Sequence, residues 1–218
     1  MKFKEMNLPN KLTTIRMFCV PFMVVLFVLL ILNRTLNLPC DFMVYENKAT
    51  SITSSLSVCQ IVMVVLFAFA SITDFVDGHL ARKHNLVSDY GKLMDPLADK
   101  LLVNTTIICM FASSMFTTHS GLEVLSIIAM VFSIIVIARD IFVDALRMQA
   151  LKKNAVVAAT IWGKLKTATL MPGIVVMILG SVNIIVFILG LSLMTLGGLF
   201  ALIGGVKYYI DLSKFIEN

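Results

Sequence analysis

Residues 74–99 read DFVDGHLARKHNLVSDYGKLMDPLAD and lie between two strongly apolar stretches. Asp74 and Asp77 are three residues apart, and Asp95 and Asp99 are four apart, so each pair shares one face of a helix. A carboxylate near the centre of a membrane helix costs roughly 2.5–3.5 kcal/mol on an insertion scale, so four uncompensated ones would threaten the fold. The pattern therefore predicts two helices whose carboxylates are neutralised together.

Hard divalent cations are the natural compensation for this carboxylate cluster. Mg²⁺ and Mn²⁺ prefer carboxylate oxygens and often share their coordination with substrate phosphates. Gly78 lets a bulky ligand approach the backbone, and Arg82 can bind a pyrophosphate oxygen. We therefore expect two cations per site, Mg²⁺ or Mn²⁺, in a clamp suited to phosphoryl chemistry at a membrane surface. A structural ion-pair cluster is the alternative.

The composition indicates a membrane protein. The 218 residues are 59% hydrophobic and only 14% charged, where a soluble domain has about a quarter. We expect an all-α polytopic protein, with residues 1–218 as a single membrane domain, a short interfacial segment at 1–10 and an outer loop at 33–56. The six expected transmembrane helices cover about residues 11–32, 57–82, 88–116, 121–149, 161–179 and 184–212.

Basic residues predict the orientation of these helices. Only Arg34 and Lys48 fall clearly in expected outer loops, which places both termini and the carboxylates on the cytoplasmic side of the cell (inner) membrane. The net charge of +5 then reflects membrane orientation and phosphate binding rather than nucleic acid. The basic residues on the expected inner side include Lys2, Lys4, Lys11, Arg16, Arg82, Lys83, Lys92, Arg147, Lys152, Lys153, Lys164, Lys166, Lys207 and Lys214.

Two further patterns leave alternatives open. Cys40 and Cys59 both fall on the expected outer side, where a disulfide is possible, although free thiols packed as small apolar groups are favoured. Gly197, Ala201 and Gly205 are four residues apart, with Gly190 and Gly204 nearby, and small residues at this spacing let helices approach closely. Close packing between helices of one chain and contact between two copies of the chain would both explain these small residues.

The run from Asp74 to Asp99 resembles the signature of the CDP-alcohol phosphatidyltransferase family, and it covers about an eighth of the chain. The resemblance implies transfer of a phosphatidyl group from a CDP-linked lipid to an alcohol, with release of CMP, by a homodimer. It implies that Asp74, Asp77 and Asp95 hold metal. Asp99 would bind metal and also take the proton from the attacking hydroxyl.

The same resemblance assigns residues to the CDP-lipid. Gly78, Ala81, Arg82 and Gly91 would line its site. The opening stretch 7–16, NLPNKLTTIR, is similar to members that use sn-glycerol 3-phosphate. It would place Asn10, Thr13 and Arg16 near the nucleotide or a phosphate, although Asn10 could simply cap the first helix.

Four cations further along the chain suggest an anionic acceptor. Arg139 and Arg147 are eight residues apart, about two helical turns, and Lys164 and Lys166 enter the next helix. We expect them, together with Arg16, to bind a phosphate monoester. Alternatively they anchor the chain at the inner surface, or Arg139 pairs with Asp140 or Asp144.

Stretches 138–140 (ARD), 146–147 (LR) and 162–167 (WGKLKT) are also similar to members that use sn-glycerol 3-phosphate. Two positions depart from that branch, because many members have Glu where Asp140 stands and a Gln is expected at Leu170. These departures concern the identity of the alcohol acceptor and do not change the expected reaction class.

The expected activity is therefore transfer of the phosphatidyl group of CDP-diacylglycerol to sn-glycerol 3-phosphate, giving phosphatidylglycerophosphate and CMP. Rival acceptors are inositol phosphate, serine and phosphatidylglycerol. A divalent-cation transporter that uses the four aspartates is the alternative from another class. The apolar residues 62–70 and 107–112 count against a polar pathway across the membrane.

Overall fold

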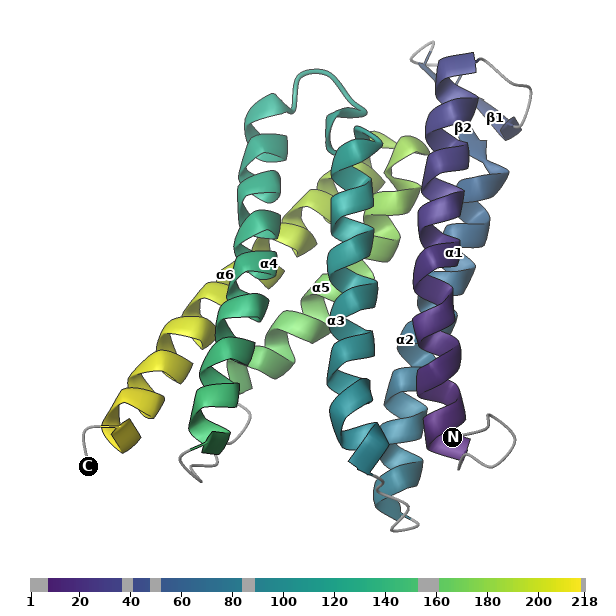
Figure 1. The fold of residues 1–218 in the computed structure, drawn as a ribbon. Coiled ribbons are helices and arrows are strands. Elements are labelled where there is room, and N and C mark those ends of the chain that lie inside the picture. The colour runs from purple at the N-terminus through teal and green to yellow at the C-terminus, as the bar shows by residue number, and fades with distance from the viewer. Residues whose placement is uncertain (1–7, 37–40, 48–51, 84–88, 153–160, 217–218) are drawn as a thin grey trace. The chain divides into compact units, whose positions relative to one another are not determined.

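The computed structural model describes residues 8–36, 41–47, 52–83, 89–152 and 161–216, of which most are helical (Figure 1). Helices α1, α2 and α3 belong to one compact unit, and α4, α5 and α6 belong to another. Short 3-10 helices follow α3 at Met115–Thr117 and α5 at Leu179–Ser181. The helices are α1 (Leu8–Leu36), α2 (Val58–Lys83), α3 (Asp89–Ala112), α4 (Glu123–Lys152), α5 (Ile161–Ile178) and α6 (Ile184–Ile216).

The predicted helices agree with the observed ones to within about four residues at each end. The third helix ends at Ala112, four residues earlier than the predicted end near 116. The chain leaves the helix there because Ser114 adopts a left-handed conformation, with φ of 54°. Helix α1 begins at Leu8, so Asn10 lies in its first turn and is not its cap.

Four helical segments of the described chain are long and apolar enough to cross a membrane: Asn10–Asn33, Glu123–Met148, Ile161–Ser181 and Ile184–Asp211. The apolar part of α2, Val58–Thr73, is shorter. Helix α3 carries Asp95, Asp99 and Lys100 in addition to charges in its first turn. A helical membrane protein is thus confirmed, and six spans remain a prediction.

A β-hairpin lies within the expected outer loop. Strand β1 (Asp41–Asn47) pairs antiparallel with β2 (Ile52–Ser57), and the register runs from Met43 opposite Leu56 to Asn47 opposite Ile52. The hairpin lies at the end of α1 where α2 begins (Figure 1). The predicted all-α fold has no strands in this loop, so the hairpin is an addition to the predicted fold. Cys40 lies outside the described residues, and Cys59 is a free thiol.

Glycines on α6 allow it to pack closely against α5. Three of them are seven residues apart, and a Cβ added to each would lie 3.0–3.2 Å from the nearest α5 atom. Since these contacts lie within one chain, close intramolecular packing accounts for the glycines. The pairs are Gly190 with Met177, Gly197 with Leu170 and Gly204 with Trp162.

A second face of α6 meets α4. A Cβ added at Gly198 would lie 2.4 Å from the Cβ of Phe132 and 2.9 Å from its carbonyl oxygen. A Cβ at Gly205 would lie 3.0 Å from the Cγ of Arg139. The backbone of α6 can therefore approach α4 only where it carries no side chain.

Replacing Gly198 by Val should destabilise the second unit by about 1–3 kcal/mol, because the new side chain would overlap the backbone of α4. The measurement is the thermal unfolding midpoint of purified protein in detergent. Leu199→Val is the matched control, since this neighbouring side chain is 39% exposed. Equal midpoints for the two variants would contradict the packing described here.

Candidate active site

The buried stripe of α1 changes from apolar to polar toward the start of the helix. Met23, Phe27 and Leu30 are each 1% exposed and pack into the first unit. In the earlier turns the buried positions are Arg16, Thr13 and Asn10, with 1%, 0% and 2% exposure. Three polar side chains are therefore held inside the unit at the same end of the helix.

The buried stripe of α3 changes in the same way. Leu102 and Ile107 are almost wholly buried, and the preceding turns carry Asp99 and Asp95, which are half-buried. The hydroxyl of Thr13 donates a hydrogen bond to the carboxylate of Asp95. The polar ends of the two stripes therefore meet. Asp95 is oriented by a residue that is itself fully buried.

Helix α2 approaches the same polar end of α1. Phe67 and Ala70 are buried, and positions 74 and 77 continue their spacing along the helix. The guanidinium Nε of Arg16 donates to the carbonyl oxygen of Ala70 at 3.3 Å, one turn before Asp74. Arg16, on α1, thus places a buried positive charge against α2 at the turn that precedes Asp74 in the sequence.

The remaining predicted residues of this site have side chains outside the described part of the chain: Asp74, Asp77, Gly78, Ala81, Arg82 and Gly91. Among the described residues, no group of three or more His, Cys, Asp or Glu side chains could hold a metal. Asp95 and Asp99 nevertheless supply oxygen donors one turn apart, and Thr13 orients one of them. This donor set fits a hard divalent cation.

The second unit contains a buried ion-pair group around Asp140. Its side chain is 2% exposed and lies between two cations. The Nζ of Lys166 donates to both carboxylate oxygens, at 2.9 and 2.8 Å, and Nη1 of Arg139 donates to one of them at 3.0 Å. Two cations and one anion leave this group with one net positive charge. We call these three residues the Asp140 triad.

The structure brings together two of the predicted acceptor-binding cations. Arg139 and Lys166 meet at Asp140, so the alternative that Arg139 pairs with Asp140 is correct for this structure. Arg147 and Lys164 are exposed, and neither forms an ion pair with another described residue. Arg16 lies in the other unit, where its guanidinium donates a hydrogen bond to the backbone of α2.

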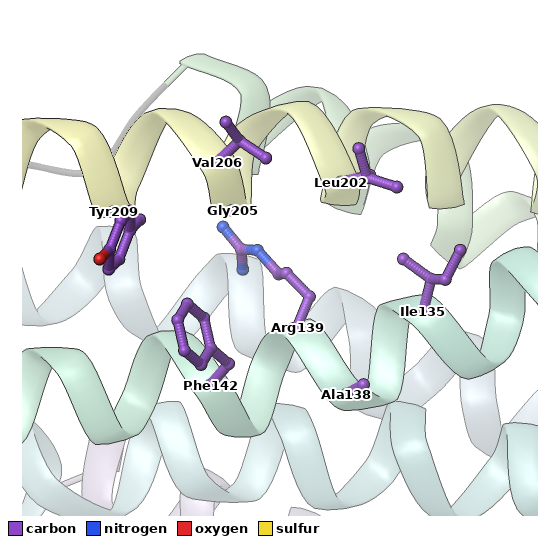
Figure 2. A pocket seen from close by; sticks show the side chains of 8 residues that line it. All are labelled: Ile135, Ala138, Arg139, Phe142, Leu202, Gly205, Val206 and Tyr209. Carbon is purple, nitrogen blue, oxygen red and sulfur yellow. The ribbon is translucent and has the colours of Figure 1, made fainter.

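Arg139 also forms one wall of an apolar recess between α4 and α6. Figure 2 shows its side chain extending from α4 toward Gly205, near Phe142 and Tyr209. The recess has a volume of about 600 Å³ and is almost entirely apolar. Its lining residues are Ile135, Ala138, Arg139, Phe142, Leu202, Gly205, Val206 and Tyr209.

Comparison with known proteins decides the family. The model of the CDP-alcohol phosphatidyltransferase family matches residues 6–196, which include every helix of the first unit and both cations of the Asp140 triad. The chain belongs to the CDP-alcohol phosphatidyltransferase family. The predicted family and the predicted class of enzyme, a transferase, are thereby confirmed.

Three relatives of this phosphatidyltransferase carry the name CDP-diacylglycerol–glycerol-3-phosphate 3-phosphatidyltransferase. The protein of Mycoplasma pneumoniae is 37% identical over 75% of this chain, which spans 63% of that relative's length. The protein of Bacillus subtilis is 34% identical over 74% of this chain and 70% of its own length. That of Rickettsia bellii is 32% identical over 99% of both chains.

The sequence of this phosphatidyltransferase indicated Asp140 as one possible partner of Arg139, but its ion pair with Lys166 was not predicted. Asp140 was considered as a shorter replacement for Glu and as a partner of Arg139 alone, whereas in the structure it is the shared partner of two cations. The signal was present, because a charged residue inside an apolar helix needs a partner. The partner across the helices, Lys166, is 26 residues away and could not be read from spacing along one helix.

Replacing Thr13 by Val should weaken metal-dependent activity about 10–100-fold, because Asp95 would lose the hydrogen bond that orients it. The measurement is activity as a function of Mg²⁺ or Mn²⁺ concentration, with the metal affinity determined separately by calorimetry. Thr13→Ser keeps the hydroxyl and is the control. A Val variant with unchanged metal affinity and activity would contradict this orienting role.

Replacing Asp140 by Asn should destabilise the protein by about 3–5 kcal/mol, because two buried cations would lose their shared carboxylate. Thermal unfolding in detergent measures the effect. Asp140→Glu retains the charge and should keep most of the stability. If the Asn variant unfolds at the same temperature as the unmodified protein, the ion-pair group does not stabilise the fold.

Proposed function

We propose that this phosphatidyltransferase transfers the phosphatidyl group of CDP-diacylglycerol to sn-glycerol 3-phosphate, giving phosphatidylglycerophosphate and CMP. Family membership supports the reaction class. The Asp140 triad supports the acceptor, because its two cations share one carboxylate and retain a net positive charge inside the protein. A phosphate monoester is an anion that such a site can bind. The names of the relatives agree with this acceptor.

In this proposal Asp74, Asp77, Asp95 and Asp99 hold two divalent cations, Mg²⁺ or Mn²⁺. The family generally depends on such cations. When bound, the cations would neutralise the pyrophosphate of the CDP-lipid and make the acceptor hydroxyl easier to deprotonate. Thr13 keeps the carboxylate of Asp95 in position, and Arg16 holds the adjoining turn of α2.

Asp99 is the proposed general base. It would accept the proton of the 1-hydroxyl of sn-glycerol 3-phosphate as the hydroxyl oxygen attacks the phosphorus that bears the diacylglycerol. The bond from that phosphorus to the CMP oxygen breaks, and CMP leaves. Both substrates react directly in this scheme, so no covalent enzyme intermediate is required.

Arg139 and Lys166 are the proposed ligands of the acceptor phosphate, with Arg147, Lys164 and Arg16 in supporting positions. Asp140 keeps the two buried cations together before the acceptor binds. Asn10, Thr13, Gly78, Ala81, Arg82 and Gly91 remain the proposed residues of the CDP-lipid site.

We further propose that residues 1–218 form one catalytic domain with six transmembrane helices in the inner membrane. Both termini and the active site face the cytoplasm, as the distribution of basic residues indicates. Membrane lipids surround the apolar helices. The homodimer implied by the family resemblance needs an interface other than the α6 glycines, since those pack within the chain.

Product analysis tests the proposed reaction. Purified protein in detergent receives CDP-diacylglycerol, Mg²⁺ or Mn²⁺, and equal amounts of sn-glycerol 3-phosphate, inositol 1-phosphate and serine. Mass spectrometry should detect phosphatidylglycerophosphate, with CMP released only when metal is present. Asp99→Asn tests the proposed role of Asp99 as general base. This variant should retain part of its metal binding and lose turnover.

Other outcomes would separate the parts of the proposal. CMP release with a different lipid product would overturn the acceptor and keep the reaction class. Full turnover by Asp99→Asn would remove Asp99 as the base. No CMP release with any metal would contradict the proposed activity as a whole.

A further inference from the structure

Tyr208 on α6 carries a buried hydroxyl that the proposed function does not yet use. The residue is 2% exposed, and its hydroxyl has no hydrogen-bond partner among the described residues. Burying an unpaired hydroxyl is unfavourable, so such a group in a ligand-free protein suggests a bound partner in the working state. Its neighbour Tyr209 differs, because it is 53% exposed and lines the apolar recess.

The helix register places Tyr208 on the side of α6 that meets α5. Gly190, Gly197 and Gly204 mark this side, as their contacts with α5 show. Tyr208 lies four residues after Gly204 and therefore on the same face. Side chains on a helix lean toward its N-terminus, so the ring of Tyr208 covers the turn that contains Gly204.

The turn at Gly204 adjoins the Asp140 triad. A Cβ added at Gly204 would lie 3.6 Å from Nη2 of Arg139, so this guanidinium lies directly against that face of α6. The Nε of Arg139 is also buried and has no hydrogen-bond partner among the described residues. The register of α6 thus places the buried hydroxyl of Tyr208 on the helix face against which Arg139, one of the cations that we assign to the acceptor, lies.

We infer that the hydroxyl of Tyr208 donates a hydrogen bond to a phosphate oxygen of the acceptor held by Arg139 and Lys166. This inference rests on the proposed function, because it adds one ligand to the proposed acceptor site. A phenolic hydroxyl suits this task, since it is a neutral donor that needs no countercharge in an apolar unit. Tyr208 is then an acceptor-binding residue that also contributes to selection of a phosphorylated alcohol.

The test compares Tyr208→Phe with Tyr209→Phe, which removes the same group from the neighbouring exposed position. Tyr208→Phe should raise the KM for sn-glycerol 3-phosphate about tenfold or more, because a hydrogen bond to a charged group is lost. Its KM for CDP-diacylglycerol should stay unchanged, and kcat should change little. Tyr209→Phe should leave both KM values unchanged.

Thermal unfolding supplies a readout that does not depend on turnover. Without ligand, Tyr208→Phe should unfold at or above the temperature of the unmodified protein, because it loses only an unpaired group. Saturating sn-glycerol 3-phosphate should raise the midpoint of the unmodified protein and of Tyr209→Phe more than that of Tyr208→Phe.

The results separate this inference from the proposed function. If the unmodified protein forms phosphatidylglycerophosphate and Tyr208→Phe has an unchanged KM for the acceptor, the inference is wrong and the function stands. A lower unfolding temperature together with an unchanged KM would show that Tyr208 serves packing alone, which also overturns the inference. If the unmodified protein forms no phosphatidylglycerophosphate, the proposed function fails and the inference fails with it.

Discussion

A carboxylate inside an apolar helical protein needs opposite charge close by, and Asp140 obtains it from Arg139 and Lys166. The same ion pairs keep two cations inside the second unit, where neither would be stable alone. Because the three residues come from α4 and α5, the charges also connect these helices. The site that we assign to the acceptor is therefore part of what holds the unit together, and binding can use cations that are already in position.

The Asp140 triad depends in turn on the shape of α6. Gly205 lets the aliphatic part of Arg139 lie against the helix backbone (Figure 2). Gly204 leaves room beside the guanidinium of Arg139 and beside Trp162. A larger residue at either position would displace the arginine or the helix. Small residues on one helix thus determine where a cation on another can lie.

In the first unit, polar and charged side chains are distributed differently along the buried helix faces. Its helices carry apolar side chains along most of their buried stripes and polar ones only toward one end, where Thr13 meets Asp95 and Arg16 meets Ala70. Asp95 and Asp99 are half-buried at this end, whereas Asp140 is almost completely buried between two cations. The two units therefore show two ways of keeping charge in a membrane protein. In the second unit Asp140 is paired with buried cations, and in our proposal the carboxylates of the first unit bind divalent cations.

The sequence by itself determined the helical membrane class, the approximate helix boundaries and the family, because apolar run length, carboxylate spacing and the Asp74–Asp99 signature are all local along the chain. It also showed that the aspartates of one pair share a helix face. Only the tertiary structure decided which partner Arg139 takes, that α6 glycines serve packing within the chain, and that Tyr208 is buried with an unpaired hydroxyl among the described residues. These features depend on contacts between helices far apart in sequence, and the spacing of residues along one helix carries no information about which residue of another helix lies opposite.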